Sequence, residues 1–202
     1  GMLPNITSSA CDVAGLFSGL GWMPPPSVPV EVVIVIKPYL TSVGTHVLMS
    51  KTDEFQLDLI QKWGNEFGSV TGRRRDVAWL DLVELRAALR GVSYSAALAI
   101  NKMDILSGLP EVRVCTAYKN KLTGERVNEF LATRAHDLHD YEAEFTTFPG
   151  WTGSMTGAAS LDCIPGNCRM FLRALQAMIG VPIKYIGTGP DTYAMIHVVG
   201  KL

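Results

Sequence analysis

The sequence predicts an α/β fold in which helices flank a mainly parallel central sheet. Runs of β-branched and small apolar residues recur at strand length, as in Glu31–Lys37 and Tyr94–Ile100. Segments with helical spacing of apolar residues, such as Phe55–Trp63 and Asn167–Gly180, separate these runs. Alternation of the two element types favours a parallel sheet. Glycine-containing polar loops follow several predicted strands, as ligand-binding loops do in such folds.

Composition and charge limit the classes of function. The chain has 202 residues, 48% of them hydrophobic, and a formal net charge of −1. This is enough chain for one domain with a substantial core. The near-neutral charge lacks the basic excess of a general nucleic-acid-binding surface. We find no apolar run of about 18 residues, so no membrane span is predicted.

The cysteine and histidine residues do not favour a metal site. The four cysteines are Cys11, Cys115, Cys163 and Cys168. They form no C-x2-C pair, so we expect free thiols in a reducing compartment. His136 and His139 lie three residues apart beside aspartates, which is one possible metal-binding face. A solvated helix face explains the same spacing and is favoured, because short matches of this kind are unspecific.

The amino-terminal region is predicted to be mostly loop. Residues 6–9 are polar and could cap a helix, but three nearby glycines weaken it, so we predict only a short helical turn over 12–17. Glu31–Lys37 is continuously apolar rather than alternating, which predicts a strand buried on both faces. The loop that follows, Pro38–Gly44, is therefore a candidate wall of a ligand site.

The most distinctive stretch is the loop Gly64–Arg75, with the sequence GNEFGSVTGRRR. Gly68 and Gly72 can adopt positive φ, and the run Arg73–Arg75 offers planar guanidinium groups that suit carboxylates or phosphates. The loop is thus equipped to hold an anion. A basic surface turn is the plainer alternative.

Two helices are predicted beside this loop. Phe55–Trp63 places Phe55, Leu59, Ile60 and Trp63 on one apolar face. The segment from Trp79 to about Arg90 also has helical spacing and is expected to end at Gly91.

A second buried strand, Tyr94–Ile100, leads into Asn101-Lys102-Met103-Asp104. An aspartate here can accept hydrogen bonds from the N1–H and 2-amino groups of guanine, a donor pair that adenine lacks. The lysine stem can lie along the purine face. A polar strand end with a surface lysine explains the four residues equally well.

The remainder alternates strand and helix. Glu111–Tyr118 reads as a half-exposed strand, and residues 126–147 as strand and loop with a short helix. Phe148–Trp151 is a tight aromatic turn in which the tryptophan is expected to pack rather than to stack on a ligand. The helix Asn167–Gly180 carries an apolar stripe made of Met170, Phe171, Ala174, Leu175, Met178 and Ile179. The last expected elements are a strand over 181–186, the loop Gly187–Pro190 and a strand over 192–199.

Three loops of nucleotide-binding type therefore occur together: GSVTGRRR, NKMD and GTGP. Their joint occurrence is more specific than any one of them. The sequence contains no G-x4-G-K-[ST], GxGxxG or GxSxG motif. Guanine-selecting elements are thus predicted without the usual triphosphate-binding loop.

These motifs resemble the adenylosuccinate synthetase family. The matching stretches are NEFGSVTGRRR, AWLDLVELR, NKMD, FPGW, YIGTGP, PNITSS and KPYLTSVG. The resemblance covers essentially the whole chain but only the carboxyl-terminal half of the family's enzyme. It implies that residues 1–202 are half of a single P-loop-NTPase-like domain. Gly1 directly before Met2 is typical of a tag remnant. The family's opening half carries a GDEGKG phosphate loop, a catalytic aspartate and a catalytic histidine, and none of these occurs here.

The resemblance implies a GTP-dependent ligase of purine and AMP biosynthesis, which joins IMP and L-aspartate to give adenylosuccinate, GDP and phosphate. It further implies Mg²⁺ held by the absent half, a cytoplasmic homodimer, and no turnover by this chain alone. A stand-alone guanine-nucleotide-binding module without catalysis is the alternative. An RNA-contacting protein is disfavoured by the near-neutral charge.

The resemblance also implies site residues, position by position. Those for IMP and L-aspartate are Thr7, Val43, Ser69, Val70, Thr71, Gly72, Arg73, Arg74 and Arg75. Those for GTP are Arg75, Lys102, Met103, Asp104, Gly187, Thr188 and Gly189. Thr7 is expected at the IMP phosphate, Val43 at its ribose, and Arg73 at both aspartate and IMP.

The sequence departs from the family pattern at several positions. Ser42 replaces an arginine, residues 45–48 replace a GPFPTE-like run, Asp76 replaces a basic residue and Gly187 replaces a serine. These departures concern mainly the expected IMP side and leave the guanine pair and the arginine loop intact.

Overall fold

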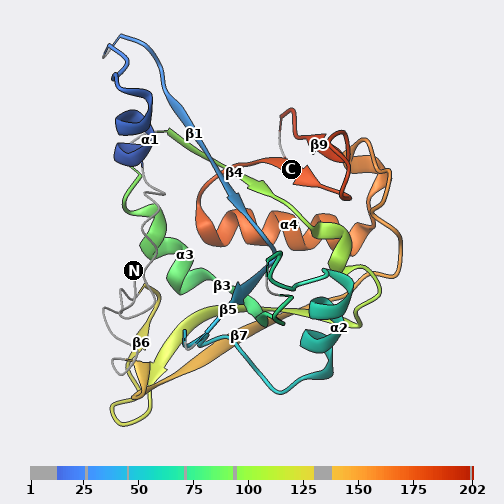
Figure 1. The fold of residues 1–202 in the computed structure, drawn as a ribbon. Coiled ribbons are helices and arrows are strands. Elements are labelled where there is room, and N and C mark those ends of the chain that lie inside the picture. The colour runs from blue at the N-terminus through green and yellow to red at the C-terminus, as the bar shows by residue number, and fades with distance from the viewer. Residues whose placement is uncertain are drawn as a thin grey trace.

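The structure is a computed structural model that describes residues 13–25, 27–44, 46–70, 72–92, 95–129, 138–200 and 202. Its helices pack on two β-sheets (Figure 1). The elements, with η for a 3-10 helix, are α1 (Val13–Leu20), β1 (Glu31–Ile36), β2 (Tyr39–Ser42), α2 (Phe55–Trp63), β3 (Asp76–Asp81), α3 (Leu82–Leu89), β4 (Ser95–Ile100), η1 (Met103–Leu106), β5 (Glu111–Asn120), β6 (Arg126–Val127), β7 (Tyr141–Pro149), η3 (Leu161–Cys163), α4 (Gly166–Ile179), β8 (Ile183–Gly187) and β9 (Met195–His197).

The central sheet is mainly parallel, as predicted. Its strand order is β1-β4-β8-β9, and only β9 runs antiparallel to its neighbour. Ile36 pairs with Ile100, and Ile100 pairs with Ile186. The three parallel strands therefore end side by side, and the loops that follow them leave from one edge of the sheet.

The second sheet was not anticipated from the sequence. Its order is β2-β3-β5-β6, with β7 also paired to β5, and β3–β5 is its parallel pair. β5 alternates between buried and partly exposed residues, which confirms the half-exposed strand expected at 111–118. The segment 126–147 contributes β6 and most of β7, and its residues 130–137 lie outside the described part of the chain.

One hydrophobic cluster joins the two sheets through α4. It contains Leu98 and Ile186 from the central sheet, Val112 from the second sheet, and Phe171 and Leu175 from α4. In Figure 1, α4 runs between β4 of one sheet and β5 and β7 of the other. The predicted helix is confirmed to within one residue at each end, and Gly180 follows it with φ of +75°.

The predicted stripe on α4 needs one correction. Met170 is 45% exposed, whereas Cys168 and Leu172 are fully buried beside Phe171. The helix is buried between two sheets, so its apolar face is turned slightly from the one that sequence spacing indicated.

The helix predicted from Trp79 is wrong at its beginning. Trp79 lies in β3, where it pairs with Tyr39 and is fully buried. α3 begins only at Leu82, because the Asp81 side chain accepts hydrogen bonds from the backbone N–H groups of Val83 and Glu84. Pairing with β2 and β5 outweighs the helical spacing of the sequence.

The prediction that β1 is buried on both faces is also wrong. Val33 and Val35 are 39% and 64% exposed, and burial alternates along β1, so one face of this strand is exposed within the described residues. α1 extends to Leu20, further than the predicted turn, with Phe17 buried. α2 has its predicted bounds, but its buried face is formed by Leu57, Ile60 and Gln61 rather than by Phe55 and Trp63.

Candidate functional site

Two of the predicted loops meet at the carboxyl edge of the central sheet. Asn101 follows β4, and Gly187 ends the adjacent strand β8. A Cβ added to Gly187 would lie 3.0 Å from both the Cα and the Oδ1 of Asn101. A glycine therefore suits this close approach, where the family pattern has serine.

The side chains of the Lys102–Asp104 segment have different surroundings. Lys102 has φ of +61° and precedes η1, which packs against both α2 and β8. The Met103 side chain is fully buried in the core, so its backbone is the part left for a ligand. Burial raises the pKa of Asp104 above its ordinary value, and the nearby Lys102 ammonium offsets this only in part.

The glycine loop after β8 is held by its own turn. Thr188 is fully buried, its N–H donates to the Ala194 carbonyl at 2.8 Å, and its hydroxyl donates to the Ala158 carbonyl at 3.4 Å. A Cβ on Gly189 would lie 3.2 Å from the Ala194 Cβ. The loop backbone is therefore rigidly placed beside Asn101.

The arginine loop connects α2 to β3 rather than following a strand. Its ends are joined by a bridge between Phe67 and Arg74, and the Gly68 N–H donates to the Arg73 carbonyl at 2.8 Å. Gly72 has φ of +66°, as its glycine permits, and Val70 is 95% exposed. The loop tip thus projects into solvent on a closed base.

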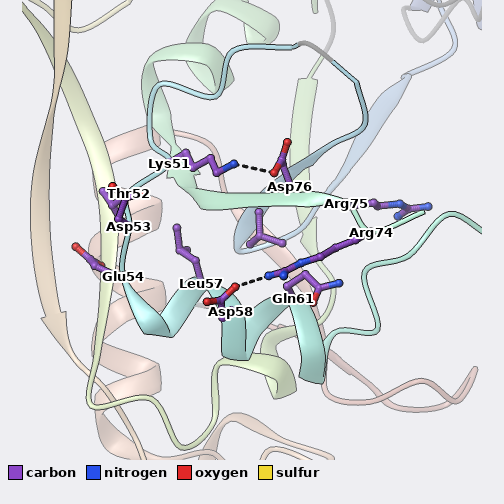
Figure 2. A pocket seen from close by; sticks show the side chains of 11 residues that line it. Lys51, Thr52, Asp53, Glu54, Leu57, Asp58, Gln61, Arg74, Arg75 and Asp76 are labelled. Carbon is purple, nitrogen blue, oxygen red and sulfur yellow. Dashed lines mark hydrogen bonds and ion pairs between the residues drawn. The ribbon is translucent and has the colours of Figure 1, made fainter. Parts of the chain in front are cut away.

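Arg74 and Arg75 are directed to opposite sides. Figure 2 shows Arg74 reaching Asp58 on α2, with which it forms an exposed ion pair, while Arg75 is turned away. Both residues line a cavity of about 370 Å³ that Lys51 and Asp76 also line. Of the residues predicted for substrates, only these two arginines line it, so this cavity is not where the predicted loops meet.

Arg75 instead joins a buried ionic cluster centred on Glu66. We call Glu66, Lys37, Tyr39, Arg75 and Lys102 the Glu66 cluster. The Glu66 side chain is 1% exposed. Its Oε1 accepts hydrogen bonds from the Tyr39 hydroxyl at 2.8 Å, Lys102 Nζ at 2.9 Å and Lys37 Nζ at 3.2 Å. Its Oε2 accepts one from Arg75 Nη1 at 3.0 Å.

The electrostatics of the cluster keep Glu66 ionised. Burial alone would raise the pKa of Glu66, but hydrogen bonds from Lys102 and Tyr39 and the charge of Lys37 lower it to about 2. Burial lowers the pKa of Lys37, and the charges of Lys102 and Arg75 act in the same direction. Burial and the Glu66 carboxylate raise the pKa of Tyr39.

Lys37 was not predicted as part of the site. Glu66 and Tyr39 lie within predicted segments, the loop Gly64–Arg75 and the candidate wall Pro38–Gly44, but neither was singled out as a site residue. One signal was available: strand-end lysines and a run of arginines need a nearby negative charge, and Glu66 is the acidic residue within the arginine stretch itself. The structure brings Arg75 and Lys102 together on Glu66, although 36 residues separate Lys102 from it along the chain.

The other predicted residues are dispersed or undescribed. Val43 lies just after β2 and is 49% exposed. Ser69, Gly72 and Arg73 lie in the arginine loop. Thr7 and Thr71 lie outside the described residues, as do Cys11 and His136.

Neither a metal cluster nor a membrane helix is found in the described parts of the chain. No three His, Cys, Asp or Glu side chains among those residues are grouped as metal ligands. Cys115, Cys163 and Cys168 are free thiols, as predicted. No described helix has both the length and the apolarity to cross a bilayer.

A second cavity, of about 330 Å³, lies beside Lys37 and contains a carboxyl group with a raised pKa. Burial, together with the neighbouring Asp81 carboxylate, raises the pKa of Glu84 to about 7. The folded protein therefore keeps this proton over a pH range in which the unfolded chain has released it. Stability should fall as pH rises from about 4.5 to 7 and stay reduced above that range.

Replacing Glu84 with glutamine should remove this contribution. Each pKa unit corresponds to about 1.4 kcal/mol, so the variant should gain up to about 3 kcal/mol in free energy of unfolding at pH 8 and little at pH 5. Urea unfolding at both pH values measures this, with the exposed Glu125→Gln as control. A wild type and E84Q variant with parallel pH profiles would contradict the prediction.

The fold and the carboxyl edge of its central sheet define a mixed α/β protein in which two candidate ligand loops lie at the ends of parallel strands. The sequence profile described as adenylosuccinate synthetase matches residues 1–196. A solved structure, of fully ligated adenylosuccinate synthetase from Plasmodium falciparum, has a TM-score of 0.90 and 32% identity. The match covers 98% of this chain and 46% of that one. The chain belongs to the adenylosuccinate synthetase family, and it spans about half the length of this solved relative.

Proposed function

We propose that this chain supplies the guanine- and aspartate-binding part of a GTP-dependent ligase. The reaction joins IMP and L-aspartate to give adenylosuccinate, GDP and phosphate. The observation that carries the proposal is the meeting of the Lys102–Asp104 segment with the Gly187–Gly189 loop at one sheet edge. Family membership supports the ligase class.

The guanine subsite is built from these two loops. Asp104 accepts the N1–H and 2-amino protons of guanine, and a carboxylate in this place discriminates against adenine. The Lys102 stem covers the purine face. Gly187, Thr188 and Gly189 complete the subsite chiefly through their backbone, because the Thr188 hydroxyl already donates to Ala158.

The arginine loop serves the other substrates. Residues 69–75 close on L-aspartate, whose carboxylates suit the paired N–H groups of Arg73. Arg73 also contacts IMP, and Arg75 contacts GTP. Thr7 and Val43 contact the IMP phosphate and ribose. Arg74 belongs to the same loop, and its pairing with Asp58 gives way when the loop closes.

The bond-making groups lie in the part of the family's enzyme that this chain does not cover. There, a catalytic aspartate helps IMP O6 to attack the γ-phosphate of GTP, giving 6-phosphoryl-IMP and GDP. The L-aspartate amine then displaces phosphate. Mg²⁺ is assigned to that same part, as the family resemblance implies. The assembled enzyme is a cytoplasmic homodimer.

Asp104→Ala tests the guanine subsite. Loss of two hydrogen bonds to a charged acceptor should weaken GTP binding by about 1–3 kcal/mol, roughly 5- to 150-fold. Wild type should prefer GTP to ITP, which lacks the 2-amino group, and the variant should lose that preference. Isothermal titration with GTP, ITP and ATP measures both effects.

Asp162→Ala is the control, because the Asp162 side chain is 95% exposed. An Asp104→Ala variant that binds GTP as wild type does would remove Asp104 from the subsite.

The wild-type chain alone should form no adenylosuccinate from IMP, L-aspartate and GTP. Turnover by this chain alone would contradict the assignment of the catalytic groups elsewhere, and tight binding of GTP without any partner chain would favour a stand-alone nucleotide-binding module.

A further inference from the structure

We propose that Glu66 is a positioning residue for the nucleotide, whose one carboxylate holds Arg75 and Lys102 in register across two separate loops. This inference rests on the proposed function, which assigns Arg75 and Lys102 to GTP. In that assignment Glu66 itself contacts none of the three substrates. It acts through the two cations that it binds.

The carboxylate connects the loops directly. Oε2 accepts from Arg75 Nη1 at 3.0 Å and Oε1 accepts from Lys102 Nζ at 2.9 Å. Lys102 Nζ also donates to the carbonyl of Gly64 at 2.9 Å, so its position is set by two groups at the end of α2. One side chain thus fixes the separation between the arginine loop and the loop after β4.

Glu66 is itself immobilised. Its N–H donates to the Gln61 carbonyl at 2.9 Å, and its own carbonyl accepts from the Gln61 side chain and from the Arg75 N–H, each at 3.0 Å. The preceding residue, Asn65, has φ of +48°, a conformation that asparagine tolerates better than most residues. An anchor held on both sides of its backbone can transmit position to the cations it binds.

The charge balance of the cluster also supports a role beside an anionic nucleotide. Three cations surround one carboxylate, and their side chains remain 26%, 34% and 39% exposed for Lys37, Arg75 and Lys102. The excess positive charge is available to an anionic ligand at the surface of the cluster. Without the Glu66 charge the three cations would repel one another, and Arg75 and Lys102 would separate.

The two cations serve different parts of the nucleotide, which makes the role of Glu66 measurable. An effect through Lys102 should alter binding of guanosine and of GTP. An effect through Arg75 should alter GTP only, because guanosine lacks phosphates. A general loss of folded structure would weaken both ligands by the same factor.

The experiment compares wild type, Glu66→Gln and Glu54→Gln by NMR titration with GTP and with guanosine. In Glu66→Gln the new amide NH₂ is a hydrogen-bond donor, and it would face the ammonium, guanidinium and hydroxyl donors that the Glu66 carboxylate accepts from. Its affinity for GTP should fall by about tenfold or more, and that for guanosine by about threefold. Glu54 is the matched control, because its carboxylate also binds an arginine, Arg113, and an aromatic side chain, the Trp79 indole N–H. Glu54→Gln should leave the ratio of the two affinities unchanged.

A Glu66→Gln protein with wild-type affinities would overturn the inference while leaving the proposed function intact. Equal losses for both ligands would also overturn it, since they leave no separate effect of Glu66 through Arg75. A wild type without preference for GTP over ATP would overturn the proposed function and this inference with it.

Tyr39→Phe is the second variant, used if circular dichroism shows that Glu66→Gln does not fold. This substitution removes one hydrogen bond from Glu66 and keeps the Glu66 charge. It should reduce GTP affinity about threefold, and an unchanged value would refute the proposal.

Discussion

Replacing Phe171 with alanine should lower the free energy of unfolding by about 3–5 kcal/mol, the cost of removing a fully buried aromatic ring. Phe171 lies on α4 and has no solvent exposure. Its ring meets that of Phe148 edge-to-face, with centroids 5.3 Å apart, and lies 5.8 Å from that of Trp151. The truncation would leave a cavity where α4 packs against the second sheet, and two aromatic rings would lose their partner.

Urea unfolding followed by tryptophan fluorescence measures this loss. Met170→Ala is the matched control, because Met170 is the adjacent residue on the same helix and is 45% exposed. It should cost less than about 1 kcal/mol, as surface substitutions generally do. Equal costs for the two variants would show that α4 is not anchored through Phe171.

The second large effect is expected from Gly150→Ala. An added Cβ would lie 1.8 Å from the Leu109 carbonyl oxygen and 2.8 Å from the Pro110 carbonyl carbon. These are backbone atoms, and the Gly150 N–H already donates to the Pro110 carbonyl at 2.9 Å, so neither segment can move away without losing this hydrogen bond. We expect a loss of about 3 kcal/mol or more, at the upper end of overpacking effects.

Gly166→Ala is the control for this prediction, because a Cβ at the start of α4 meets no atom within 4 Å. Thermal unfolding of the two variants should separate them by about 6–12 °C for a chain of this size. A Gly150→Ala protein that melts with wild type would mean that the close approach between residues 109 and 150 can relax.

Local sequence patterns predicted the bounds of α2 and α4 to within one residue. Each helix has helical spacing of apolar residues and a glycine directly after its end. The family resemblance assigned the Lys102 and Gly187 loops to one GTP site, and in the structure both loops leave the same edge of parallel strands. Trp79 was misplaced because the same apolar spacing fits a buried strand, and only pairing with β2 and β5 decides between them.

The Glu66 cluster could not be derived from spacing. Its members come from the end of β1, the start of β2, the end of α2, the start of β3 and the loop after β4, and Lys37 and Glu66 are 29 residues apart. Residue chemistry and the family resemblance together singled out Arg75 and Lys102. Their common partner depends on how the chain returns to one sheet edge, which is a tertiary property.

The order of strands in the central sheet also bears on how fast the molecule folds. β4 lies between β1 and β8, and the ion pair of Lys184 with Glu31 spans 153 residues of chain. Closing such long loops costs entropy before any contact repays it, so we expect the antiparallel β5–β7 pair to form before the β1–β4–β8 edge. A ligand at that edge would find its site only after the rate-limiting step. Nucleotide bound there would slow unfolding and leave the rate of folding unchanged.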